Sequence, residues 1–207
     1  MSTKPRMLNV GGNSKAIAIP RWYQGFEHLL LDIDAAAKPD IVCDARNLGT
    51  LEASTFDAIY CSHNLEHYFA HDVSRVLQGF LHVLKPTGFA EIRVPDLDVL
   101  MKTYVEKEMD IEDVLYQSNA GPITIRDVIY GFGREIERSG ADFYAHKTGF
   151  TRKSLIRALH AAGFSAAVAS VGRQYEILAF GFREMPTPAQ IELLGLKLPP
   201  TPQAQRH

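Results

Sequence analysis

The sequence is poor in three features that mark particular classes of protein. Its 207 residues include only two cysteines, Cys43 and Cys61, which lack the paired spacing of a disulfide framework or a zinc site. Its 22 basic residues are scattered and nearly balanced by 24 acidic ones, so no positive patch points to nucleic acid. No apolar run approaches the roughly 18 residues of a membrane span. We therefore expect no nucleic-acid partner and no membrane insertion.

The beginning of the chain also lacks a targeting segment. MSTKPRMLNVGG has a short apolar patch before two glycines, which does not resemble the apolar region of a signal peptide. Both cysteines lie inside apolar runs and are interpreted as small buried side chains in a reducing compartment. These features predict a cytoplasmic protein.

Apolar runs alternate with amphipathic stretches along most of the chain. Five runs are typical of parallel strands, at residues 6–10, 28–34, 40–43, 56–61 and 88–94. Between the last two, one helical face carries apolar residues at spacings of three and four: Val73, Val76, Leu77, Phe80, Leu81 and Leu84. The run Lys85-Pro86-Thr87-Gly88 should end this helix before the next strand. Strand–helix–strand units in series indicate a doubly wound α/β sheet.

Residues 97–145 interrupt this alternation. They begin as a helix and continue through glycines and aromatic residues, as an insertion after the carboxyl end of a strand. Such insertions usually cover the ligand crevice of an α/β enzyme. We therefore interpret this segment as a cover over the ligand site.

The alternation of helices and strands resumes after the insertion with a helix, which we expect to begin at Thr151 and to end at Gly163. Two strands follow, at residues 164–171 and 174–182, and their short link requires them to be antiparallel. We expect one domain over residues 1–185 and an extension at 186–207, with one short helix and a disordered tail, PPTPQAQRH.

Polar residues follow three successive strands, where open α/β sheets bind ligands. The first strand ends in Gly11-Gly12-Asn13, where glycine lets the backbone approach a ligand. Asp32, with Asp34 as its reserve, follows at the spacing of about twenty residues at which a carboxylate binds a ribose diol. Asp44 could accept a hydrogen bond from an adenine amino group, with the Ala45 N–H facing the ring. Ordinary turn residues are the alternative for each.

A dinucleotide site would use similar residues, but G-x-G-x-x-G is missing. Counting from Gly11, the second and third glycine positions hold Asn13 and Ala16. The terminal antiparallel pair also departs from an all-parallel nicotinamide-binding sheet. A nicotinamide oxidoreductase is therefore the least favoured of the enzyme classes considered.

A series of motifs resembles the class I S-adenosylmethionine-dependent methyltransferases. The matching strings cover most of residues 6–182: LNVGGN, LLLDID, PDIVCDARNL, FDAIYCSHNLEHY, FLHVLKPTGFAEIRVPDL and HKTGFTRKSLIRALHAAGF. SHNLEH, VLKPTG and IRVPD are similar to small bacterial methyltransferases often found near surface-polysaccharide genes. The resemblance implies a Rossmann-like, seven-stranded sheet with the last strand antiparallel. It also implies S-adenosylmethionine as cofactor and O- or N-methylation of a small-molecule or saccharide-like acceptor.

The resemblance also implies a set of cofactor-binding residues around the ends of the first four strands: Gly11, Gly12, Asn13, Asp32, Asp34, Asp44, Ala45, Ser62, His63 and Asn64. The glycines would contact the methionine part, Asp32 the ribose, and Asp44 with Ala45 the adenine. The turn departs from the family's usual Gly-x-Gly. A cofactor-binding module with weak or no turnover is therefore the alternative.

A hydroxyl acceptor has to lose a proton, which requires a base with a pKa near 7. His63 is the first candidate for this catalytic role and His146 the second, whereas a nitrogen or carboxylate acceptor needs no base.

A metal site is a separate question. One face of a helix that began early enough would carry four residues of metal-ligand type: His63, Glu66, His67 and His71. We expect no metal there, because the pattern is not H-E-x-x-H and a turn before Asp72 would break the face.

Aromatic and basic residues are frequent in the insertion. The aromatics could pack on a sugar or aromatic acceptor, form the local core of a flap, or contribute to a homodimer surface: Tyr116, Tyr130, Phe132, Phe143 and Tyr144. Arg126, Arg134 and Arg138 could bind an acidic acceptor, although such spacing is more typical of local ion pairs.

Overall fold

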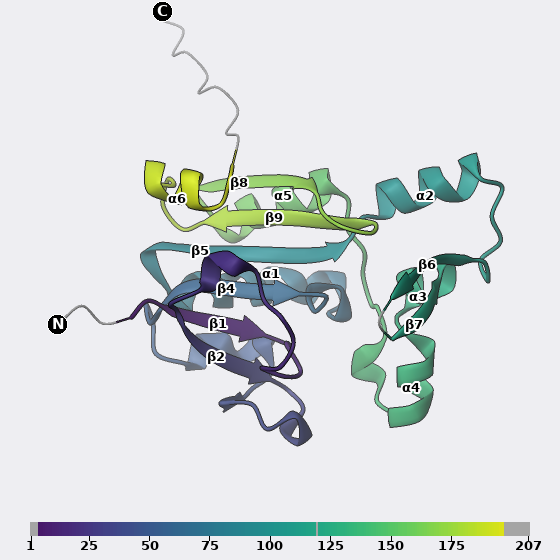
Figure 1. The fold of residues 1–207 in the computed structure, drawn as a ribbon. Helices are drawn as coiled ribbons and strands as arrows, with labels where there is room; N and C mark the ends of the chain where they lie inside the picture. Colours follow the sequence, from purple (N-terminus) through teal and green to yellow (C-terminus); the bar gives the residue numbers. More distant parts are fainter. Residues whose placement is uncertain (1–3, 119, 197–207) are drawn as a thin grey trace, which may run out of the picture.

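A computed structural model describes residues 4–118 and 120–196. Its main feature is a seven-stranded sheet in the order β3-β2-β1-β4-β5-β9-β8 (Figure 1). β9 runs opposite to the other six strands of this sheet, which confirms the predicted Rossmann-like sheet with an antiparallel last strand. The strands are β1 (Arg6–Val10), β2 (Glu27–Asp32), β3 (Ile41–Val42), β4 (Phe56–Ser62), β5 (Leu84–Pro95), β8 (Ala166–Val171) and β9 (Glu176–Phe182).

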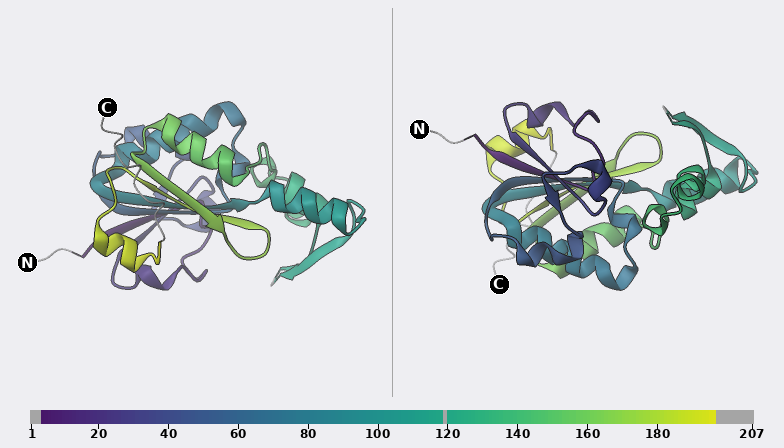
Figure 2. Two further views of the ribbon diagram at one scale, coloured as in Figure 1. Left: turned by 90° about the horizontal axis from the view of Figure 1, so that it is seen from above. Right: turned by 90° about the horizontal axis from the view of Figure 1, so that it is seen from below.

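Different elements cover the two faces of the sheet (Figure 2). Helices α1 (Ala70–Val83) and α5 (Arg152–Ala162) pack on one face and close the larger apolar core. The 3-10 helix η1 (Arg21–Tyr23) and α6 (Pro188–Leu193) lie on the other. A second, more aromatic core lies beneath these two, and Leu194 from the expected extension is buried in it.

Local sequence signals account for the two long helices of the first face. The predicted apolar face of α1 is buried, with Val76, Leu77 and Phe80 fully inaccessible. Thr151 begins α5 through a reciprocal capping box with Ser154. Gly163 ends it in the left-handed conformation that glycine adopts without steric cost.

Two local predictions were wrong. β5 begins at Leu84 rather than at residue 88, because Leu84 already pairs with Phe56. The residues predicted to form a turn lie inside the strand, where the pairing with β4 shifts its register. Strand–helix–strand units were expected in series, yet in the described chain an α-helix joins only β4 to β5 among the first five strands. Short 3-10 helices occupy the earlier links: η1, η2 (Ala35–Ala37) and η3 (Ala45–Thr50).

The insertion lies beyond the carboxyl ends of the parallel strands (Figure 1). It contains α2 (Leu97–Glu106), β6 (Val114–Ser118), β7 (Gly121–Thr124), α3 (Ile125–Tyr130), α4 (Gly133–Ser139) and η5 (Asp142–Tyr144). β6 and β7 form a separate antiparallel pair that the sequence pattern did not predict. Leu100, Ile125 and Val128 form a small core of its own.

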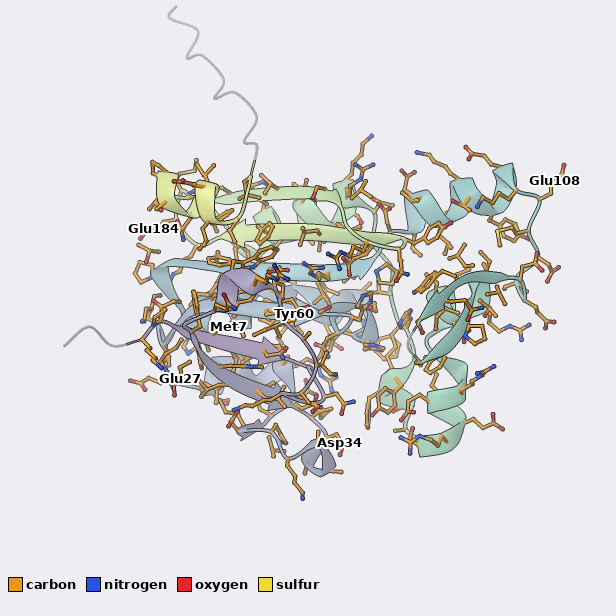
Figure 3. All side chains as sticks on the ribbon, viewed as in Figure 1. Met7, Glu27, Asp34, Tyr60, Glu108 and Glu184 are labelled. Atoms are coloured by element: carbon orange, nitrogen blue, oxygen red, sulfur yellow. The ribbon has the colours of Figure 1, made fainter. Side chains whose placement is uncertain are left out.

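Charged side chains project from the periphery, whereas Met7 and Tyr60 lie in the second core (Figure 3). Both cysteines are free; Cys61 is buried and Cys43 is half-buried. Among the described residues, no helix has the length and apolar character needed to cross a membrane. The predicted disordered tail lies outside the described residues.

Candidate active site

The ends of β1, β2, β3 and β4 surround a first hollow. Six of the ten predicted cofactor-binding residues line it: Gly11, Asn13, Asp32, Asp44, His63 and Asn64. Phe143, Tyr144 and Lys147, from η5 and the segment after it, form the opposite side. The insertion therefore contributes to the same hollow as the strand ends.

Asp32 joins the two turns at the base of this hollow. Its Oδ2 accepts the N–H of Asn13 and its Oδ1 accepts the N–H of Asp34, each at 3.0 Å. Each oxygen keeps a second lone pair, so the carboxylate can still accept from a ribose diol. Gly11 adopts φ +69°, and a Cβ there would lie 2.1 Å from the Asn64 side-chain nitrogen. Asp32 therefore fits the ribose of S-adenosylmethionine, and Gly11 lines the same hollow, packed closely against Asn64.

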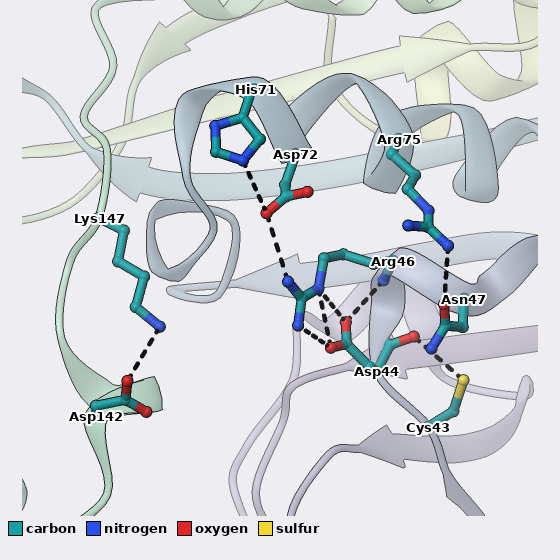
Figure 4. A network of polar contacts seen from close by, with 9 residues as sticks. All are labelled: Cys43, Asp44, Arg46, Asn47, His71, Asp72, Arg75, Asp142 and Lys147. Atoms are coloured by element: carbon teal, nitrogen blue, oxygen red, sulfur yellow. Dashed lines mark hydrogen bonds and ion pairs between the residues drawn. The ribbon is translucent and has the colours of Figure 1, made fainter.

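At the predicted adenine contact, the carboxylate of Asp44 is already engaged. Arg46 donates to its Oδ2 from Nη2 at 2.6 Å and from Nε at 3.0 Å (Figure 4). Burial alone would raise the pKa of Asp44, but Arg46 outweighs it and lowers the pKa. Arg46 also lies 3.5 Å from Asp72. An adenine amino group could reach Asp44 only if the guanidinium moved.

The other four predicted residues do not line the first hollow. A Cβ at Gly12 would overlap the side chain of Asn9, so its small size serves internal packing. Asp34 turns to accept the N–H of Ala36 and begins η2. Ala45 is buried in the main core, and Ser62 ends β4.

A second hollow adjoins the first and shares His63, His67 and Tyr144 with it. The insertion and the turn before β9 supply most of its remaining walls: Tyr116, Ile123, Asp127, Val128, Phe132, Glu135, His146, Gln174 and Tyr175, with Pro95 from β5. The rings of Tyr116 and Tyr175 stack with centroids 6.2 Å apart.

The aromatics and arginines of the insertion separate into distinct groups. Tyr130 is 59% exposed and lies outside both hollows, whereas the other four predicted aromatics each line at least one of them. Arg126 and Arg138 form exposed ion pairs with Glu112 and Glu135, as the alternative interpretation expected.

His63, at the boundary of the two hollows, lies between two carboxylates. Its Nε2 is 3.2 Å from Oε2 of Glu176, and its Nδ1 is 3.4 Å from Oε1 of Glu66. Desolvation alone would lower the pKa of His63, but the two carboxylates outweigh it and raise the pKa to about 10. Water screens part of this attraction, since the side chain is 51% exposed, and the shift remains upward. An imidazolium cannot accept a proton, so this geometry does not support the predicted base role of His63.

His146 has the properties that His63 lacks. Its Nδ1 donates to the carbonyl oxygen of Val128 at 3.0 Å, which leaves the lone pair of a neutral ring on Nε2. Burial lowers the pKa of His146; Glu66 opposes this shift and His67 reinforces it. His146 is therefore neutral at physiological pH and suited to accept a proton.

The helical face considered as an alternative for His63, Glu66, His67 and His71 does not form. His63 precedes the 3-10 helix η4 (Leu65–His67), and His71 is an exposed residue of α1 beside Asp72. Glu66, His67 and His146 instead come within 4.8 Å of one another. Both His67 ring nitrogens, however, lie 3.1 Å from backbone carbonyl oxygens, so this ring offers no free lone pair to a cation.

Three charged residues of this region were not predicted as site residues. Arg46 directly follows the predicted Asp44-Ala45 pair, and a basic residue so close to an expected ligand was an available signal. Glu176 begins the otherwise apolar strand β9, where an acid is unusual. Glu66 appeared in the sequence analysis only as a potential metal ligand.

The sequence matches the family described as methyltransferase domain over residues 2–168. No curated protein is similar enough in sequence to match the chain.

Three similar solved structures illustrate the shared fold. A SAM-dependent methyltransferase from Archaeoglobus fulgidus has a TM-score of 0.54 and 14% identity, with 86% of each chain covered. An O-methyltransferase family protein from Burkholderia thailandensis has a TM-score of 0.52 and 12% identity, with 87% of this chain and 51% of that chain covered. The 1,6-didemethyltoxoflavin-N1-methyltransferase of the same organism was solved with bound 1,6-didemethyltoxoflavin and S-adenosylhomocysteine. It has a TM-score of 0.50 and 16% identity, with 87% of this chain and 72% of that chain covered.

These identities establish the fold, and the family match covers more than three quarters of the sequence. The chain therefore belongs to the methyltransferase-domain family and is an enzyme of the class I S-adenosylmethionine-dependent type.

Proposed function

We propose that the enzyme methylates a hydroxyl group of a small, saccharide-like acceptor. S-adenosylmethionine would occupy the first hollow and the acceptor the second. The observation that carries this proposal is the junction of the two hollows at His63, His67 and Tyr144, with His146 in the lining of the second hollow. A neutral imidazole at this position favours a hydroxyl acceptor, because an amine acceptor can react without a base.

The lining of the second hollow supports a saccharide-like acceptor. The stacked rings of Tyr116 and Tyr175 offer an apolar surface for the C–H face of a sugar. The phenol groups of the lining can exchange hydrogen bonds with sugar hydroxyls. The similar Burkholderia proteins act, by name, as O- and N-methyltransferases, so nitrogen remains the second acceptor atom to test.

S-adenosylmethionine supplies a methyl group on a sulfonium, and the reaction is an in-line displacement that depends on positioning and exclusion of water. Asp32 and Gly11 would orient the cofactor from the sheet, and Phe143 and Tyr144 would enclose it from the insertion. His146 would accept the hydroxyl proton on Nε2, while its Nδ1–H stays bonded to Val128.

The test is incubation of the full chain with S-adenosylmethionine and separate panels of sugars, phenols and amines. Mass spectrometry would detect S-adenosylhomocysteine and the methylated product. We expect turnover with hydroxyl acceptors and a loss of about a hundredfold or more in kcat for His146→Gln. Turnover of amines alone, with His146→Gln fully active, would contradict O-methylation. Cofactor binding with no turnover in any panel would favour the alternative of an inactive binding module.

A further inference from the structure

Charged side chains of alternating sign lead from the sheet interior to the wall between the hollows. Glu91 on β5 is fully buried and accepts a hydrogen bond from Arg93 Nε at 2.7 Å. Arg93 Nη1 donates to Oε1 of Glu176 at 3.0 Å, and the other oxygen of Glu176 faces His63. His63 in turn approaches Glu66, so the series ends on a carboxylate.

Glu66 is the least compensated member of this series. Its side chain is 1% exposed, and neither of its carboxylate oxygens accepts a hydrogen bond from the described residues. The cation beside it is His63, whose Nδ1 lies 3.4 Å from Oε1 of Glu66. The other ring nitrogen of His63 is paired with Glu176. A buried carboxylate is stable only if it gains further positive charge or hydrogen-bond donors.

The next polar group beyond Glu66 is His146. Its Nε2 lies 4.0 Å from Oε1 of Glu66, while Nδ1 is committed to the carbonyl oxygen of Val128. In the neutral state the unprotonated Nε2 therefore lies close to a carboxylate. A proton on Nε2 would turn this unfavourable approach into an ion pair of two buried groups.

We propose that Glu66 is a positioning residue for methyl transfer: it is the counter-ion for the imidazolium that forms when His146 takes the acceptor proton. This inference rests on the O-methylation proposed above. The acceptor O–H bond breaks and its proton moves to Nε2 of His146. The electron pair of the oxygen forms the new bond to the methyl carbon, and the pair of the broken C–S bond remains on sulfur. His63 holds Glu66 in place as a fixed cation.

Several other titratable groups face His146 or share its hollow. The ring centroid of His67 lies 4.9 Å from that of His146, and His63 approaches the same Oε1 of Glu66 as His146 does. The carboxylate of Asp127 already accepts from Thr124 and Gly133, and Glu135 pairs with Arg138. Glu66 is thus the carboxylate in a position to respond to a proton on His146.

The proposal can be tested on the full chain without any acceptor. Histidine-selective 15N NMR would follow the tautomer and titration of each ring in wild type, Glu66→Gln, His63→Asn and the surface control Glu112→Gln. Glu66→Gln should lower the apparent pKa of His146 by about one unit, as expected for loss of an opposite charge at this distance. His63→Asn should raise the apparent pKa of His146, because Glu66 then lacks the positive charge of His63. Asparagine suits the positive φ of residue 63.

An electrostatic role of Glu66 shifts the apparent pKa of His146 in opposite directions in the two variants. A merely structural role would shift it in the same direction in both. A His146 titration that is unchanged in Glu66→Gln would overturn the proposal even if O-methylation is correct. Once an acceptor is known, Glu66→Gln should lower kcat about tenfold or more, with KM and S-adenosylhomocysteine affinity retained. Activity that is lost on chelation and restored by Zn²⁺ would instead make a metal the partner of Glu66 and overturn the proposal.

Discussion

Replacement of Asp32 by alanine tests the cofactor site where its geometry is best defined. The carboxylate joins two turns through the N–H groups of Asn13 and Asp34 and lines the first hollow. Hydrogen bonds to a charged group contribute about 1.5–3 kcal/mol each. Because water can reach both turns, we take the lower end, and the variant should lose about 3 kcal/mol of unfolding free energy. For a domain of this size the melting temperature should fall by about 6–12 °C.

Loss of the ribose contact adds an effect on binding. One charged hydrogen bond of about 1.5–3 kcal/mol corresponds to a loss of about ten- to a hundredfold in affinity. Isothermal titration calorimetry with S-adenosylhomocysteine, combined with thermal unfolding, measures both effects. Asp34→Ala is the matched control, since Asp34 only caps a 3-10 helix and its loss should cost about 1 kcal/mol of stability. Unchanged affinity in Asp32→Ala, or a larger loss in Asp34→Ala, would show that the ribose assignment is wrong.

Three further perturbations address the same region. Gly11→Ala should weaken S-adenosylhomocysteine binding and lower the melting temperature, because the new Cβ meets Asn64; Gly140→Ala, at a similar φ in open space, controls for backbone strain alone. Arg46→Ala should tighten binding by about two- to fivefold in calorimetry, because it removes a competing ion pair of modest strength; weaker binding would mean that the guanidinium itself contacts the cofactor. His63 has a raised pKa, so its stabilising contribution is complete below about pH 6.5 and is lost as the pH rises toward that pKa. His63→Asn should therefore flatten the decline in unfolding free energy above pH 6.5, and urea titrations that give an unchanged pH slope would refute the ion pairs.

The order of the elements could be predicted because each signal lies within a few neighbouring residues. The apolar run of β2, the apolar face of α1 and the caps of α5 at Thr151 and Gly163 all depend on local periodicity or backbone geometry. The short link between β8 and β9 left only an antiparallel pairing. Parallel strands also end at one edge of the sheet, which brings residues such as Gly11 and Asp32 into a common hollow.

Tertiary structure decided the chemical state of the site. His63 follows β4 in the sequence position expected of a base, but Glu176 reaches it from 113 residues away and makes it a cation. Burial lowers the pKa of His146, and no local pattern encodes that burial. The sequence by itself therefore determined the family, the sheet and the edge at which the candidate site lies. Which histidine can accept a proton depends on carboxylates and burial contributed by distant segments, and only the folded chain brings these together.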